Sequence, residues 1–157
     1  MHILSQFMQA PKEEHIDATR RVVRYIKGTA GQGLFLPKNS KLELVGYYDS
    51  DWGACPITRQ SLTGYFIKLG NSPISWKTKK QNTVSRSSPK AKYRSLTEAT
   101  SELIWLRSFL ASLGFFLRNP TPLFCDNQLA LHIANNPVFH ERTKHNELYC
   151  HFAREKL

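Results

Sequence analysis

The sequence predicts an α/β fold built on a mixed β-sheet that is flanked by helices. Two observations lead to this prediction. Short apolar runs with the character of strands precede one long amphipathic segment with helical periodicity. Behind that segment, a strand-like run at residues 121–125 is followed by a short helical run. Strands and helices in this order are typical of α/β layers, in which helices cover a sheet.

The N-terminal part of the chain is predicted to hold one helix over residues 15–27. Its apolar positions are Ile16, Val22, Val23 and Ile26, and Gly28 is a typical helix stop. Residues 28–33 are rich in glycine, so we expect a flexible joint before the first strand.

Three strands are predicted ahead of the long helix. The first covers residues 42–48. The next two, residues 61–69 and 73–78, are expected to form an antiparallel hairpin, because Gly70, Asn71 and Ser72 between them form a turn signal. Trp76 on the third strand is expected to lie in the core.

The long helix is the best-defined element. Ser88 is its expected N-cap, Pro89 suits the first helical position, and Gly114 ends it. Lys92 is expected to face inward in the first turn, where the helix dipole favours acidic side chains. Lys92 extends an inward-facing stripe of apolar residues that follow one another at steps of three and four. These residues are Leu96, Ala99, Leu103, Leu106, Leu110 and Leu113.

The remaining elements are a strand ending at Cys125, a short helix over residues 128–134 and a last strand or loop over residues 143–150. A helical pattern begins at residue 151 and stops with the chain.

Length and composition restrict the class of protein. The 157 residues suffice for one ordinary domain with a short appendage, and a hydrophobic content of 41% indicates a folded chain. No apolar run approaches the length of a membrane helix, and the N-terminus does not resemble a secretory signal. We therefore expect a cytoplasmic or nuclear protein that is not secreted and has no membrane partner. The three cysteines are widely spaced and fit reduced thiols.

The charge is strongly basic. The net charge is +10, from 22 basic and 12 acidic residues, and no acid occurs between Trp52 and Thr97. Basic residues interleaved with aromatic ones suit a phosphate backbone, so contact with nucleic acid is predicted, with a solvated basic face as the alternative. The residues expected to make the contact are Arg59, Lys77, Lys79, Lys80, Arg86, Lys90 and Arg94.

Three acids are the candidate chemical groups. Asp49 and Asp126 each follow a strand-like run, and Glu147 lies near the C-terminus. If the two strands are parallel neighbours, both aspartates meet at one edge of the sheet, where ligands of such folds bind. An ensemble of carboxylates usually binds divalent metal for phosphodiester hydrolysis.

Six motifs follow one another along most of the chain. They are Gly-Tyr-Tyr-Asp-Ser-Asp-Trp-Gly (46–53), Thr-Arg-Gln-Ser-Leu-Thr-Gly-Tyr (58–65), Ile-Ser-Trp-Lys (74–77), Thr-Val-Ser-Arg-Ser-Ser (83–88), Phe-Cys-Asp-Asn (124–127) and Asn-Pro-Val-Phe-His-Glu-Arg-Thr-Lys-His (136–145). Together they resemble the ribonuclease H domain of copia-type retrotransposon polyproteins. Residues 4–8 and 18–29 are similar to the tail of the reverse-transcriptase region that precedes this domain.

The resemblance implies a domain organisation and partners. Residues 1–40 would be the tail of the reverse-transcriptase or connection region, and residues 41–157 a ribonuclease-H-like domain truncated at its C-terminus. The substrate would be an RNA–DNA hybrid or another nucleic acid. The reverse transcriptase of the same polyprotein would be the former partner.

The resemblance also implies roles for the acids. In the family, four acids hold two Mg²⁺ ions that hydrolyse RNA paired to DNA. Asp49 resembles the first acid, Asp126 the third and Glu147 the fourth, which would make them metal ligands. The second acid normally ends the Glu-Ala-Glu part of Ser-Ser-x-Glu-Ala-Glu-Tyr-Arg. Residues 87–94 read Ser-Ser-Pro-Lys-Ala-Lys-Tyr-Arg, with Lys90 and Lys92 at the two glutamate positions.

We therefore expect Lys92 to pair with Asp49 or Asp126, to exclude at least one metal ion, and to abolish or nearly abolish hydrolysis. An ammonium has only donors, so it cannot ligate a cation. Several alternatives remain open: Lys92 as an ordinary snorkelling lysine, a non-catalytic nucleic-acid-binding module, an inert relic, and slow Mn²⁺-dependent cutting by Asp49, Asp126 and Glu147.

Overall fold

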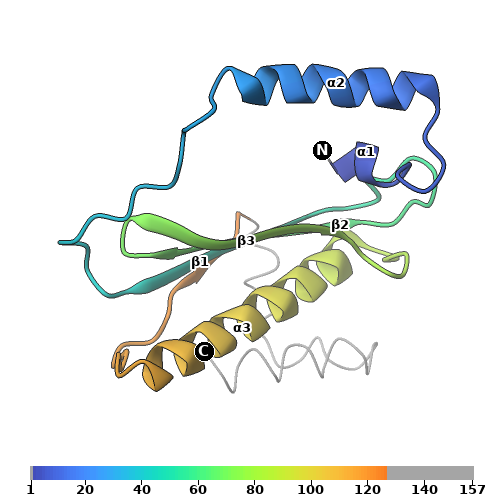
Figure 1. Cartoon of the computed structure of the whole chain (residues 1–157). Helices are drawn as coiled ribbons and strands as arrows, with labels where there is room; N and C mark the ends of the chain where they lie inside the picture. The colour runs from blue at the N-terminus through green and yellow to red at the C-terminus, as the bar shows by residue number, and fades with distance from the viewer. Residues whose placement is uncertain (1, 127–157) are drawn as a thin grey trace. The chain divides into compact units, whose positions relative to one another are not determined.

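The computed structural model describes residues 2–126 (Figure 1). These residues divide into two compact units, the first ending at Phe35 and the second beginning at Leu36. The resemblance placed a boundary after residue 40, and the origin of the first unit in a reverse-transcriptase region stays a prediction. Among the described residues, no helix has both the length and the apolar character that crossing a membrane requires.

The first unit contains two helices, α1 (His2–Ser5) and α2 (Glu13–Lys27). The ring of Phe7 stacks on the ring of His15, with centroids 4.0 Å apart. Helix α2 has acidic residues in its first turn and basic residues in its last turn, an arrangement that the helix dipole favours. It ends at Lys27, as predicted, and begins two residues before the predicted start at residue 15.

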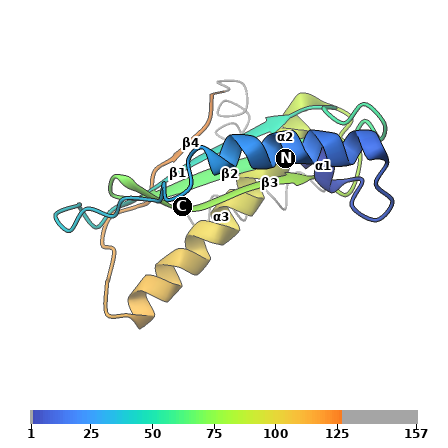
Figure 2. The same ribbon diagram turned by 45° about the horizontal axis from the view of Figure 1, so that its top comes forward.

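The second unit is built on a four-stranded mixed sheet with the order β3-β2-β1-β4, whose strands are labelled in Figure 2. Its strands are β1 (Leu44–Asp51), β2 (Leu62–Leu69), β3 (Ser72–Lys80) and β4 (Leu123–Phe124). Strand β1 pairs antiparallel with β2 and parallel with β4. The predicted α/β class with a mixed sheet is therefore confirmed, and the two strands that precede the aspartates are parallel neighbours.

The predicted hairpin between β2 and β3 is also confirmed. Its turn requires glycine, because Gly70 has a φ of +57°, and a Cβ there would lie 2.5 Å from the carbonyl oxygen of Lys41. The Oγ of Ser40 accepts a hydrogen bond of 3.1 Å from the backbone N–H of Asn71 and so fastens the turn to the segment before β1.

The long helix, α3 (Ser88–Ser112), packs along one face of the sheet against β1 and β2 (Figure 2). Leu103 is 1% exposed, and a Cβ at Gly46 of β1 would lie 3.2 Å from its Cδ1 atom. The close approach of helix and strand thus depends on the missing side chain of Gly46. The core of this interface consists of Leu44, Tyr48, Tyr65, Ile67, Tyr93, Leu96, Ala99, Leu103, Leu106 and Leu110.

Two predictions about α3 are corrected. The N-cap is Ser87 rather than Ser88, because Ser88 is the first residue of the helix. Leu113 lies at the C-cap, beyond the last residue of α3, and is 56% exposed, so the inward stripe ends at Leu110. The stripe stops there because the chain turns away from the sheet at Gly114, where φ is +87°.

The prediction that Trp76 lies in the core is wrong, since it is 60% exposed. Its neighbours on β3 face α3: Ser75 donates a hydrogen bond to Glu102, and Lys77 pairs with Glu98. Successive side chains of a strand point to opposite faces, so Trp76 points away from α3.

The first strand extends beyond the predicted range of 42–48 and ends at Asp51. Asp49 therefore lies within β1 rather than after it. The helix predicted over residues 128–134, the strand or loop over 143–150 and the helical pattern from 151 lie outside the described residues.

Candidate functional site

The register of the sheet places Asp49 beside Asp126. Tyr47 of β1 pairs with Phe124 of β4 in a parallel ladder. Each aspartate follows its paired residue by two positions, so both carboxylates stand at the same level of neighbouring strands. Asp49 and Asp126 are both open to solvent, with side chains 61% and 74% exposed.

Helix α3 brings Lys92 to the same place. Its Nζ atom lies 2.5 Å from Oδ1 of Asp126 and 3.2 Å from Oδ1 of Asp49. Lys92 itself is only 6% exposed, because the side chain runs inward from the first turn of α3. The predicted meeting of Lys92 with the two aspartates is confirmed, and the reading of Lys92 as an ordinary snorkelling lysine does not fit a side chain buried to this degree.

The ionisation of the pair follows from these contacts. Burial alone would lower the pKa of Lys92, but its hydrogen bonds to Asp126 and Asp49 outweigh burial, and the pKa is raised. The hydrogen bond from Lys92 lowers the pKa of Asp126. The two directions agree, since each group favours the charged form of the other: Lys92 stays protonated and Asp126 ionised at neutral pH.

The described residues do not fit a Mg²⁺ ion held between Asp49 and Asp126. The ammonium of Lys92 takes the place between the two carboxylate oxygens, and it offers no lone pair to a cation. Residues 2–126 contain no group of three or more His, Cys, Asp or Glu side chains placed to hold a metal ion. Glu147, the third predicted ligand, lies outside the described residues.

A buried polar network holds the first turn of α3, and sequence reasoning missed its central residue. Nε2 of Gln81 donates hydrogen bonds of 3.0 Å to Oγ1 of Thr63 on β2 and to the carbonyl of Ala91 on α3. Its Oε1 accepts a hydrogen bond of 3.0 Å from Ser85. Because Ala91 precedes Lys92, Gln81 links the turn that carries Lys92 to β2. In the sequence, Gln81 follows two lysines at the end of a strand, where a polar residue is usually exposed to solvent, so nothing there reveals its buried role.

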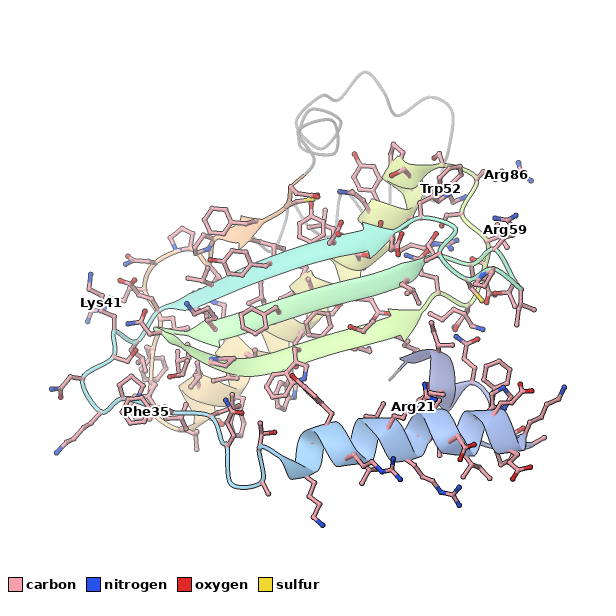
Figure 3. The ribbon with its side chains drawn as sticks, turned by 90° about the horizontal axis from the view of Figure 1, so that it is seen from above. Arg21, Phe35, Lys41, Trp52, Arg59 and Arg86 are labelled. Carbon is pink, nitrogen blue, oxygen red and sulfur yellow. The ribbon has the colours of Figure 1, made fainter. Side chains whose placement is uncertain are left out.

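The seven predicted nucleic-acid contacts lie on different elements, but β3 ends at the same end of the sheet as the loop that carries Arg59, because Lys80 pairs with Leu62 and Leu62 with Asp51. Arg59 and Arg86 lie with Trp52 at one end of the sheet (Figure 3). Lys90 is half-buried in the first turn of α3. Lys77 makes an ion pair of 2.8 Å with Glu98 of α3. The other three residues, Lys79, Lys80 and Arg94, line one cleft.

The contribution of the Lys92 pair to stability should depend on pH at both ends of the scale. We expect the difference in unfolding free energy between the parent chain and a Lys92→Met variant to be constant between about pH 4 and 10. Asp126 has a lowered pKa, so its contribution is present above the ordinary aspartate value and is lost as pH falls through the folded pKa. Lys92 has a raised pKa, so its contribution is lost only as pH rises through that value.

Urea unfolding in EDTA from pH 2 to 12 measures this difference. A difference that does not change below pH 4 would show that the carboxylates do not interact with Lys92.

Comparisons with known proteins agree with the fold and the motifs. The chain is 45% identical over 154 residues to the retrovirus-related Pol polyprotein from transposon RE1 of Arabidopsis thaliana, covering 98% of this chain and 10% of that protein. It is 35% identical over 155 residues to the retrovirus-related Pol polyprotein from transposon TNT 1-94 of Nicotiana tabacum, covering 99% of this chain and 12% of that protein. The chain thus spans about a tenth of the length of these relatives.

A solved structure supports the architecture. LC11-RNase H1, isolated from compost, superposes with a TM-score of 0.53 at 15% identity, covering 74% of this chain and 79% of that protein. At such an identity the likeness shows the fold alone. No protein-family model matches the chain. The relatives establish that the chain belongs to the retrovirus-related Pol polyproteins of transposons, and its fold is that of ribonuclease H.

Proposed function

We propose that this domain descends from a two-metal ribonuclease acting on RNA–DNA hybrids, and that Lys92 disables the hydrolysis. One observation carries the proposal: the ammonium of Lys92 lies within 3.2 Å of a carboxylate oxygen of both aspartates. The catalytic, metal-binding and nucleic-acid-binding roles of the predicted residues are part of this proposal.

The electrostatics of the site favour this reading. Two divalent ions about 3.5–4 Å apart need carboxylates that share them. A positive charge fixed between those carboxylates neutralises part of their attraction and repels an approaching cation. Lys92 already provides the counter-charge for Asp49 and Asp126. The ammonium also relieves the repulsion between the two carboxylates, so the fold should not need a metal ion at this site.

Cleavage of a labelled RNA–DNA hybrid in Mg²⁺ tests the proposal. We expect the parent chain to show little or no cleavage, and a Lys92→Glu variant to cut faster by about 100-fold or more, the scale of one catalytic electrostatic group. A Lys41→Glu variant makes the same charge change at an exposed residue, at the other end of the sheet from Trp52 (Figure 3), and should behave as the parent does.

Cleavage by the parent at the rate of the Lys92→Glu variant would contradict the proposal. Slow cleavage by the parent in Mn²⁺ but not in Mg²⁺ would replace it with residual hydrolysis by the remaining acids.

Binding of nucleic acid without cleavage is a second candidate function. The observation that favours it is a group of basic residues around one cleft: Lys79, which is exposed, and Lys80 and Arg94, which are half-buried. A bound duplex would release counterions, so affinity for the hybrid should fall steeply as salt rises. Absence of any affinity at low salt would instead indicate an inert relic.

A further inference from the structure

A cleft of about 430 Å³ lies between the end of β3, the segment after it and the side of α3. It is separate from the Lys92 site, since neither Lys92 nor the two aspartates line it. Arg94 follows Lys92 by two residues, which turns its side chain about 200° around the helix axis. The residues that line the cleft are Thr63, Lys79, Lys80, Gln81, Asn82, Thr83, Arg94, Thr97 and Glu98.

The charges around the cleft favour an anion. Lys79, Lys80 and Arg94 are cationic, and Glu98 is the one acid among the residues that line it. Glu98 is already neutralised by the ion pair of 2.8 Å with Lys77, which lies outside the lining. Lys79 is exposed and makes no ion pair with any residue from 2 to 126. The cleft therefore has an excess of positive charge, and the ammonium of Lys79 is accessible to an anionic ligand.

Arg94 is held in place before any ligand arrives. Its Nη1 atom donates hydrogen bonds of 3.0 Å to the carbonyl of Thr83 and of 3.3 Å to Oγ of Ser85. Both partners belong to the segment that Gln81 anchors to β2 and α3. A guanidinium has five N–H donors, so donors remain for a ligand after these contacts. A cation whose position is fixed loses less entropy on binding.

We propose that this cleft receives a phosphate group of a nucleic-acid backbone. Lys79 and Arg94 supply the charge, and the side chains of Asn82 and Thr83 supply further donors at the mouth. The inference rests on the proposed binding of nucleic acid, and it names where one backbone contact is made. The cleft and the Lys92 site lie on different sides of α3, so a duplex that reaches both crosses the N-terminal part of this helix.

Binding of a fluorescent RNA–DNA hybrid at increasing salt tests the site, with Lys79→Gln as the variant. Each phosphate contact contributes about 0.9 to the slope of log affinity against log salt. We expect Lys79→Gln to bind several-fold more weakly at low salt and to lose about this amount of slope. Lys68→Gln removes the same charge from β2 on the face opposite α3, and it should keep the slope of the parent.

Titration with inorganic phosphate, followed by amide NMR at constant ionic strength, tests the cleft independently of the hybrid. The amide signals of Asn82 and Thr83 should shift saturably in the parent and not in Lys79→Gln. If Lys79→Gln and Lys68→Gln bind the hybrid with the same salt slope, and phosphate causes no saturable shift, the cleft is not a phosphate site. Nucleic-acid binding by the domain would still stand. A saturable shift without hybrid binding would support the cleft as a phosphate site and refute the proposed nucleic-acid binding.

Discussion

Mg²⁺ should stabilise a Lys92→Glu variant against unfolding and should have no specific effect on the parent chain. The substitution removes the ammonium that lies between Asp49 and Asp126 and adds a third carboxylate to the site. Without metal, these like charges repel, so the variant should be less stable than the parent. When Mg²⁺ is present, the same three carboxylates can bind the ion. A ligand that binds only the folded state at 100 times its Kd adds about 2.7 kcal/mol, which amounts to several degrees in the unfolding midpoint.

Thermal unfolding followed by circular dichroism measures this effect, with NaCl at matched ionic strength as the control for screening. Lys41→Glu should respond to Mg²⁺ as the parent does, because residue 41 is exposed and lies before β1. This experiment separates metal binding from catalysis. An equal rise for the parent and for Lys92→Glu would show that Lys92 does not exclude the ion, whatever the outcome of the cleavage assay.

The inward position of Lys92 could be predicted because it depends on a local rule, and its meeting with the aspartates depends on a second rule about the sheet. Its distance of four residues from Leu96 places it on the inward stripe of a regular helix, and Lys92 is indeed buried. Two parallel neighbouring strands bring Asp49 and Asp126 to one edge. The first rule is local, but the pairing of these two strands joins residues far apart in the chain, and the sequence could offer it only as a condition. The distances within the site depend on how α3 sits on the sheet, which the sequence pattern does not specify.

The orientation of Trp76 could not be predicted, because an apolar side chain on a strand does not by itself reveal its face. The register of β3 shifts near Ile67 and Lys68, and such an irregularity changes which residues share a face. Trp76 pairs with Phe66, which is also exposed. Gln81 was missed for a related reason, since its role arises from contacts with residues 18 and 10 positions away along the chain.

Leu103→Ala should be the most destabilising substitution discussed, and Leu113→Ala is its matched control near the end of the same helix. Leu103 is 1% exposed and lies against Gly46 of the central strand, so its removal leaves a cavity that the glycine cannot fill. Buried leucine-to-alanine changes cost about 2–5 kcal/mol. Leu113 has the same sequence pattern but is 56% exposed, and a surface change usually stays within about 0.5 kcal/mol.

Urea unfolding of the two variants compares these costs, with equal m-values as evidence that the unfolded states are alike. If both substitutions cost the same, the packing of α3 on β1 through Leu103 is wrong. The hydrophobic pattern assigns the two leucines to one stripe, so only the termination of α3 at Ser112 distinguishes them. A large difference would therefore demonstrate that α3 rests on the sheet as described. The contact between Lys92 and the two aspartates depends on the same packing of α3 against the sheet.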